Sequence, residues 1–191
     1  MDELKKREKK WRLTQNLGFL FPTIMGLALL ILVITFIIPN RPAAPEKVTQ
    51  AMEKLGYSPW DTTEEFRQKW SMGDELTSCL SARTTGIRID YVQADNYHNR
   101  NRVSGQFSAY MNNVLPFPDD VIHDGNHDYS LYCIGSNGHY LLKIEIRKAV
   151  LFIEWNSPQT PDVLEFLKEV DCPIPKKMKG WIRSAIPEKM Y

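Results

Sequence analysis

The side chains best suited to metal binding gather within residues 119–128, a stretch with two histidines and four aspartates. Histidine nitrogens and carboxylate oxygens at short spacing can hold zinc or another divalent ion. His123 and His127 would share one side only on a helix, and the glycine–asparagine pair between them predicts a loop. Our main interpretation is therefore a solvated polar connector from Asp119 to His127, with no metal and no cofactor. The candidate ligands in the alternative, a metal site, are His123, Asp124, His127 and Asp128.

Two further sets of residues could take part in catalysis. Glu145 and Glu154 lie on neighbouring predicted strands and could approach each other as a general acid and base. Ser136 lies in a Gly-Ser-Asn-Gly stretch, which lacks the Gly-x-Ser-x-Gly spacing of a nucleophile elbow and reads instead as a hairpin turn. The sequence contains no glycine-rich phosphate loop and no His-Glu-x-x-His motif. Because paired surface carboxylates are common in strands, the sequence favours a protein that is not an enzyme.

Four arginines of the central region form a basic group that could contact an anionic partner, such as a wall polymer or a lipid headgroup. The alternative is a solvated charged face. The members of this group are Arg83, Arg88, Arg100 and Arg102.

The C-terminal residues 176–191 are basic and amphipathic. On a helix, Met178, Trp181 and Ile182 would share one side, with lysine and arginine on the rest. This pattern is typical of a helix that lies in a membrane interface, although docking against the protein's own domain is equally physical. The residues predicted at the interface are Lys177, Trp181, Ile182 and Arg183, together with Trp11 near the other end of the chain.

Residues 17–38 form the most distinctive stretch, with 22 residues and no charged side chain. A helix of this length is about 33 Å long, enough to cross a hydrocarbon core of about 30 Å. The preceding residues 1–16 are rich in lysine and arginine, and this bias keeps such a head in the cytoplasm. We therefore predict a cytoplasmic head, an uncleaved transmembrane signal anchor, a proline-rich spacer over residues 39–45, and an extracytoplasmic domain over residues 46–175. The alternatives are a cleaved signal peptide and a pilin-like leader.

Composition limits the partners of this chain. It contains 24 Lys and Arg and 23 Asp and Glu, and the first 41 residues hold seven of the basic residues but only three of the acids. The remaining part is weakly acidic, which disfavours nucleic-acid binding because such binding depends on neutralising phosphates. An odd number of cysteines, Cys79, Cys133 and Cys172, indicates buried thiols or one optional disulfide rather than a disulfide framework.

The elements that would carry these residues follow from hydrophobic periodicity. Helical spacing predicts four helices, and alternation predicts three consecutive strands after residue 128, with a further half-buried strand from Ile87. The stretch 74–85 fits a strand only weakly. The predicted fold is thus α+β, with an antiparallel sheet of three to four strands packed by helices. The helices are expected at residues 45–55, 62–70, 99–113 and 160–170, and the three consecutive strands at residues 128–135, 140–146 and 149–155.

The segment KLGY…DTTEEF, from Lys54 to Phe66, precedes a strand and helix, a meander and a final helix. This order resembles small membrane-anchored domains of unknown function in Gram-positive bacteria, and the resemblance implies a bacterial envelope protein. It contains no motif of known activity. We therefore predict a single-pass protein that displays an interaction or sensing domain, whose partners are the lipid bilayer and another envelope protein or a second copy of itself. The alternatives are an envelope enzyme with a metal site, or a structural component of a secretion, pilus or division assembly.

Overall fold

A computed structural model describes residues 25–26, 45–172, 174–178 and 180. The chain divides into two compact units, Met1–Arg41 and Pro42–Tyr191, and the second is considered by itself below. No helix within the described ranges is both long enough and apolar enough to span a membrane. The predicted span lies outside them except for Met25 and Gly26, as do the predicted interface residues Trp11, Trp181, Ile182 and Arg183.

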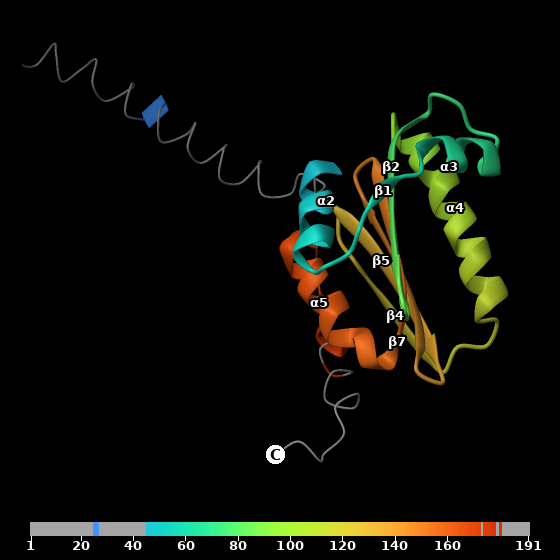
Figure 1. The fold of residues 1–191 in the computed structure, drawn as a ribbon, viewed down its shortest axis with the longest axis vertical. Helices are drawn as coiled ribbons and strands as arrows, with labels where there is room; N and C mark the ends of the chain where they lie inside the picture. The colour runs from blue at the N-terminus through green and yellow to red at the C-terminus, as the bar shows by residue number, and fades with distance from the viewer. Residues whose placement is uncertain (1–24, 27–44, 173, 179, 181–191) are drawn as a thin grey trace, which may run out of the picture. The chain divides into compact units, whose positions relative to one another are not determined.

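The domain is built on one antiparallel sheet of seven strands, in the order β1-β2-β3-β7-β6-β5-β4 (Figure 1). This confirms the α+β fold but corrects the predicted number of strands, since three to four were expected. The strands are β1 (Trp60–Asp61), β2 (Leu76–Thr84), β3 (Ile87–Ala94), β4 (Asp120–Gly125), β5 (Tyr129–Ser136), β6 (His139–Ile146) and β7 (Ala149–Asn156).

Tight turns connect the central strands and fix their register. The β5–β6 turn has both Asn137 and Gly138 at positive φ, 52° and 76°, as a two-residue hairpin requires. Gly86 has φ +86° between β2 and β3. In the β6–β7 turn, however, Arg147 takes φ 49°, a left-handed conformation that glycine or asparagine adopts at lower cost.

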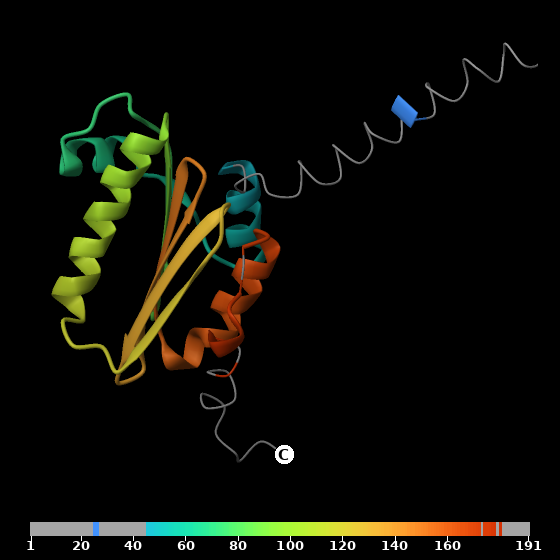
Figure 2. The same ribbon diagram turned by 180° about the vertical axis from the view of Figure 1, so that it is seen from behind.

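Helices cover both faces of the sheet (Figures 1 and 2). One face packs against α2 and α5, and the other against α3 and α4, so two hydrophobic clusters form, one on each face. The helices are α2 (Pro45–Lys54), α3 (Thr63–Trp70), α4 (Tyr97–Val114) and α5 (Thr160–Glu169), with a short 3-10 turn, η1 (Ser157–Gln159), before α5.

Burial on both faces corrects the prediction that β3 is half-buried. Ile89 and Tyr91 face one cluster, whereas Val92 belongs to the other. Asp90, which reads as a solvent-facing residue in the sequence, has no exposed surface. The alternation of apolar and polar residues in a sequence predicts a strand with one buried face. It does not reveal that the other face is buried too when a polar residue on that face, such as Asp90, is paired with its neighbours in the fold.

Two threonines at the starts of helices bond to the core instead of capping the helix. The hydroxyl of Thr62 does not cap α3 but lies 3.1 Å from the hydroxyl of Ser81, within the core. Thr160 lies inside α5, where its hydroxyl accepts a hydrogen bond from the indole nitrogen of Trp155 at 3.1 Å. The side chain of Asn96, in contrast, does cap α4, since it accepts a hydrogen bond from the backbone N–H of Asn99 at 2.9 Å.

The start of the C-terminal segment packs against the domain. Met178 is fully buried in the cluster beneath α2 and α5. The ammonium of Lys177 donates to the carbonyl of Val121 on β4 at 3.1 Å and lies 3.7 Å from the carboxylate of Asp120. The described part of this segment therefore docks on its own domain.

All three cysteines are buried and free. Burial raises the pKa of Cys79 and of Cys172 to about 12, and it raises the pKa of Cys133 further. The thiols consequently stay protonated and unreactive in the folded domain.

Candidate functional site

The structure does not bring the four candidate metal ligands together. The predicted loop over residues 119–127 is wrong in its first part, because Asp120–Gly125 forms β4, the edge strand of the sheet. His123 lies on β4 with its ring 6.1 Å from that of Tyr132, whereas His127 lies in the turn that follows. Among the residues that the structure describes, no group of three or more His, Cys, Asp or Glu side chains could hold a metal ion.

The two glutamates proposed as a pair lie on the same face of the sheet but far apart. Glu145 faces Val150 across the β6–β7 ladder, and Glu154 lies four residues further along β7. At about 3.4 Å per residue and about 4.8 Å between strands, this places their backbone positions roughly 14 Å from each other. The geometry excludes direct cooperation, and each glutamate instead belongs to a separate polar cluster beneath one end of α4.

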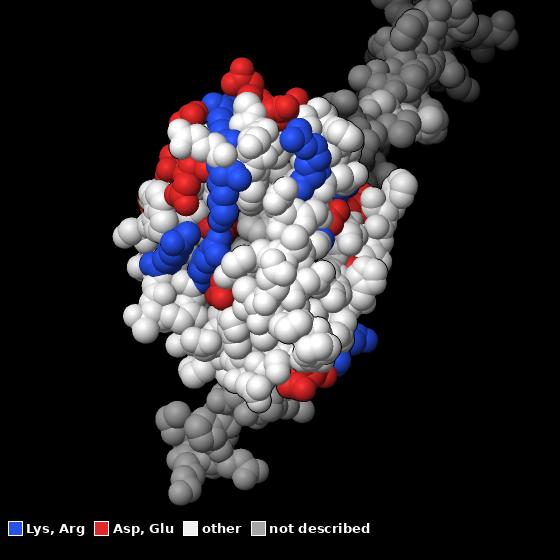
Figure 3. All heavy atoms as spheres, turned by 90° about the vertical axis from the view of Figure 1, so that its right-hand side faces the viewer, with Lys and Arg blue, Asp and Glu red and all other residues white. Residues whose placement is uncertain are grey.

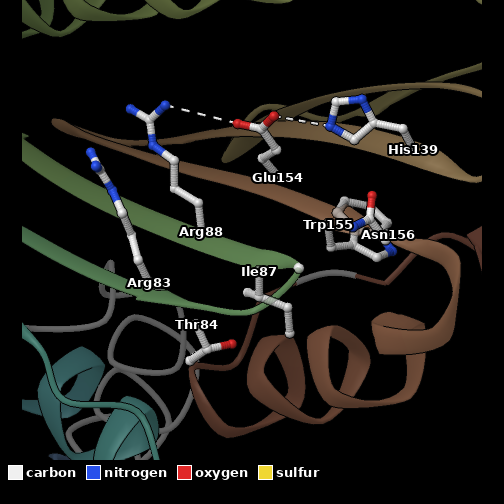
Figure 4. A pocket seen from close by; sticks show the side chains of 9 residues that line it. Arg83, Thr84, Ile87, Arg88, His139, Glu154, Trp155 and Asn156 are labelled. Carbon is white, nitrogen blue, oxygen red and sulfur yellow. Dashed lines mark hydrogen bonds and ion pairs between the residues drawn. The ribbon is translucent and has the colours of Figure 1, made fainter.

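The first cluster surrounds a cavity of about 230 Å³, which we call the Arg88 cavity (Figure 4). It lies at the end of the sheet where β2 turns into β3 and where β7 ends. In Figure 4 the side chains of Arg83 and Arg88 approach from one side and that of His139 from the other, with Glu154 between them. The polar residues that line it are Arg83, Thr84, Arg88, His139, Glu154 and Asn156.

In the Arg88 cavity, Arg88, Asp90 and Glu154 are paired with one another, whereas Arg83 makes no ion pair with any residue that the structure describes and lies 5.9 Å from the ring centre of Trp60. The Arg88 guanidinium lies 2.6 Å from the carboxylate of Asp90, which also accepts from the hydroxyl of Ser81 at 2.7 Å. Although burial disfavours the charged form, the Asp90 carboxylate raises the pKa of Arg88 above its ordinary value. This part of the cluster is a buried ion pair with its hydrogen bonds satisfied.

Glu154 completes the same cluster. Its two carboxylate oxygens lie 2.9 Å from the imidazole of His139 and 2.9 Å from the hydroxyl of Tyr110 on α4, and the Arg88 guanidinium lies 3.8 Å away. Burial raises the pKa of Tyr110, and the hydrogen bond to Glu154 raises it further. The cluster thus ties the C-terminal half of α4 to the sheet.

The second cluster opens into a larger cavity of about 330 Å³, which we call the Arg100 cavity. It lies beside the first turn of α4, the turn between β4 and β5, and the turn between β6 and β7. Figure 3 shows the face of the domain that α3 and α4 cover, where basic and acidic side chains gather together towards one end and the middle is mostly uncharged. The residues that line the cavity include Tyr97, Arg100, His127, Ser130, Glu145 and Arg147, with Asn126, Asp128 and Tyr129 completing it.

One carboxylate in the Arg100 cavity serves two cations. Glu145 lies 3.0 Å from the guanidinium of Arg100 and 3.2 Å from the ammonium of Lys143, and it accepts a hydrogen bond from Ser104. Burial disfavours its charge, but the Ser104 hydroxyl and the two cations together hold the pKa of Glu145 below its ordinary value. Glu145 is therefore a carboxylate in the folded domain at neutral pH.

Lys143 lies behind Glu145, between β6 and α4, and is only 8% exposed. Its ammonium donates to the hydroxyls of Ser104 and Ser108, each at 2.7 Å. A serine and a lysine at this distance can act as nucleophile and base in other proteins. Here both are covered by α4, Ser104 is held by Glu145, and neither lines the Arg88 cavity or the Arg100 cavity, so the pair has a structural role.

Arg147 is the second arginine of the lining, which also contains the carboxylate of Asp128. Unlike Arg100, it makes no ion pair with any residue that the structure describes. The first turn of α4 also lacks an acidic residue, although the N-terminus of a helix carries partial positive charge that acids normally balance. The Arg100 cavity thus holds one arginine without an ion pair, beside the start of α4.

The structure divides the predicted basic group among three places. Arg83 and Arg88 line one cavity, Arg100 lines the other, and Arg102 lies 3.7 Å from Glu75 at the surface. Sequence reasoning missed Lys143 and Arg147. A lone lysine inside the apolar strand HYLLKIEI is the signal that could have identified the first.

Comparison with known proteins gives no relative: no protein-family model, no curated protein and no solved structure matches this chain.

Proposed function

We propose that this chain is a single-pass membrane protein whose α+β domain, outside the cytoplasm, is an interaction or sensing module. The 22 uncharged residues 17–38 and the basic head before them support the membrane anchor and its orientation. The resemblance to envelope domains of Gram-positive bacteria supports the same placement. The Arg100 cavity is the binding site of this module.

The observation that carries this proposal is an arginine that lines a cavity without making an ion pair. Most charged groups beneath α4 are paired with each other, whereas Arg147 lines a cavity of about 330 Å³ without an acidic partner among the described residues. Ligand sites are concave and hold a few polar groups that converge from different elements. The Arg100 cavity has these properties, because its lining comes from α4 and two separate turns.

Binding rather than catalysis agrees best with the groups present. The cavity lining contains no cysteine, and its one serine, Ser130, lies on β5 in a row that faces Glu145. The metal-dependent alternative would need His123 and His127 to converge, and they lie on a strand and in a turn. The residues that line the cavity can hold and orient a charged ligand.

The anchor and its direction can be tested by thiol labelling of intact cells. Lys5→Cys and Ala43→Cys place one reporter on each side of the predicted span. The native cysteines give little background because they are buried and their pKa values are raised. We expect a membrane-impermeant maleimide to label residue 43 and not residue 5. Labelling of residue 5 alone would reverse the topology, and a mature protein that lacks its first forty residues would remove the anchor.

The binding site can be tested with the full chain in detergent by measuring thermal unfolding with a panel of small anions, amines and neutral sugars. We expect some member of the panel to raise the unfolding temperature of the wild type, because a ligand that binds only the folded state stabilises it. Arg147→Gly should abolish that shift. Arg83→Ala, which removes an arginine from the Arg88 cavity, is the matched control and should keep it. A panel with no effect on the wild type would contradict the proposal.

A further inference from the structure

We propose that the Arg100 cavity binds the phosphate group of a small phosphorylated molecule. The inference rests on the proposed function and specifies the ligand class of the same site. Four features carry it: the charge of the cavity, the directions from which its donors come, its size, and the backbone conformation of Arg147.

The charges around the site leave one arginine without an ion pair. The lining carries Arg100 and Arg147 against Glu145 and Asp128, and Lys143, which lies outside the lining, shares the carboxylate of Glu145 with Arg100. The partial positive charge at the start of α4 lies in the same place and has no acid in its first turn. An anion that carries one to two charges, as a phosphate ester does, would pair with Arg147 and with the start of this helix.

The donors line the cavity from four elements, which suits a tetrahedral anion. Arg100 comes from α4, Arg147 from the β6–β7 turn, and His127 from the β4–β5 turn. Ser130 and Tyr129 add hydroxyl groups on β5. A phosphate presents three oxygens in different directions and accepts from such an arrangement, whereas a planar carboxylate is satisfied by a single arginine fork.

The size of the cavity limits what can be attached to the phosphate. A volume of about 330 Å³ is near the lower end of ligand pockets, which run from roughly 300 to 1,000 Å³. A phosphate with a short polyol chain fits this space. The rest of a polymeric ligand would have to extend out of the cavity through its open side.

Arg147 itself provides the fourth feature. Its backbone has φ 49°, where an L-residue other than asparagine or aspartate is disfavoured. Glycine would satisfy the β6–β7 turn with less strain, so the turn does not explain an arginine there. A role of the Arg147 side chain in the cavity explains the arginine, because this side chain supplies the charge that has no ion pair.

The test is isothermal titration calorimetry of the full chain in phosphatidylcholine nanodiscs, with inorganic phosphate and glycerol 3-phosphate as probes and glycerol and acetate as controls. We expect both phosphates to bind and both controls to give no heat. Arg147→Gly should weaken phosphate binding by about 10- to 100-fold, the effect of losing one charge-assisted pair. Arg83→Ala should bind as the wild type does, and Arg147→Lys should retain part of the affinity.

A second arm separates a soluble phosphate from a lipid headgroup. The same titration in nanodiscs that contain phosphatidylglycerol should give unchanged affinity if the ligand is soluble, and a lower apparent affinity for glycerol 3-phosphate if the lipid headgroup occupies the site. Either result supports a phosphate site.

Other results would overturn the inference. Absence of phosphate binding by the wild type, or equal binding by Arg147→Gly, would refute it. Binding of acetate or of another member of the ligand panel, lost in Arg147→Gly, would refute the phosphate class while the proposed binding function stands. Thermal unfolding of each variant shows whether it is folded, and the removal of backbone strain makes Arg147→Gly a variant that should fold at least as well as the wild type.

Discussion

The two ends of α4 use the same residue types for different purposes. The Arg88 cavity and the Arg100 cavity each contain two arginines, one glutamate and one histidine. At the first, Asp90 and Glu154 neutralise Arg88, and the bonds hold helix to sheet. At the second, Glu145 is shared by Arg100 and Lys143. Each cavity also has one arginine without an ion pair among the described residues, but Arg83 lies over the ring of Trp60, whereas Arg147 lies among the hydrogen-bonding groups beside the start of α4. The surroundings of the unpaired arginine, rather than its presence, distinguish the two sites.

The largest effect should come from breaking the Arg88 cluster. Arg88→Met removes the partner of Asp90, which is fully buried, and leaves its charge with only the Ser81 hydroxyl. We expect the free energy of unfolding to fall by about 3–5 kcal/mol, as when one member of a buried pair is lost. Urea unfolding of the full chain, followed by tryptophan fluorescence, measures this. Arg83→Ala is the control and should change stability by less than about 0.5 kcal/mol; a loss below about 1 kcal/mol for Arg88→Met would contradict the interpretation.

Lys143→Met should have a smaller effect. The substitution keeps the apolar stem but removes the donor to Ser104 and Ser108, while Glu145 keeps Arg100. We expect a loss of about 1–2 kcal/mol, the cost of leaving buried hydroxyls short of a partner. The same unfolding experiment measures it. If Lys143→Met proved as harmful as Arg88→Met, the two clusters would not differ in the way described.

The pH dependence of stability should report on Glu145. Because the folded domain holds the pKa of Glu145 below the ordinary value of 4.5, its carboxylate contributes stability above that pH. The contribution is lost as the pH falls through the folded pKa. Glu145→Gln should therefore be less stable than the wild type at pH 7, and the difference should shrink below about pH 4.5. Urea unfolding at a series of pH values tests this, and a difference that grew towards low pH would have the wrong sign.

Arg147→Gly should give the smallest change in stability, in the opposite direction. Glycine accepts the left-handed backbone at residue 147, and the gain is partly offset by the greater freedom of glycine in the unfolded chain. We expect a gain of about 0.5 kcal/mol together with loss of ligand binding. Arg147→Ala, which keeps the strain, should lose binding without the gain. Destabilisation by Arg147→Gly would show that the arginine supports the fold, as Arg88 does.

The sequence predicted the elements whose periodicity is strong. The four helices and the three consecutive strands from residue 128 are confirmed, with boundaries that shift by a few residues. The edge strand β4 was missed because only Ile122 among its residues is buried, so the stretch DVIHDG has too little alternation to be recognised. β1 has only two residues, Trp60 and Asp61, and is defined by its pairing with β2 rather than by any local pattern.

The candidate site was harder to predict than the fold. Arg100 and Glu145 were each recognised as chemically capable, but their pairing depends on how α4 crosses β6, and no spacing along the chain reveals that crossing. The sequence placed Glu145 beside Glu154 because adjacent strands can bring any two residues together. The register, which is a product of the turn at Arg147 and Lys148, decides that they are apart.

Helices α2 and α5 are joined to each other. Lys47 and Lys54 on α2 form ion pairs with Asp171 and Glu169 at the end of α5, and the buried face of α2 shares one cluster with that of α5. During synthesis α2 therefore emerges well before the surface that covers it. The sheet can form while the apolar face of α2 is still bare, and the core on this side closes only when the final helix arrives. A chaperone that binds the apolar face of α2 would therefore bind the nascent chain and not the folded domain, in which α5 covers this face.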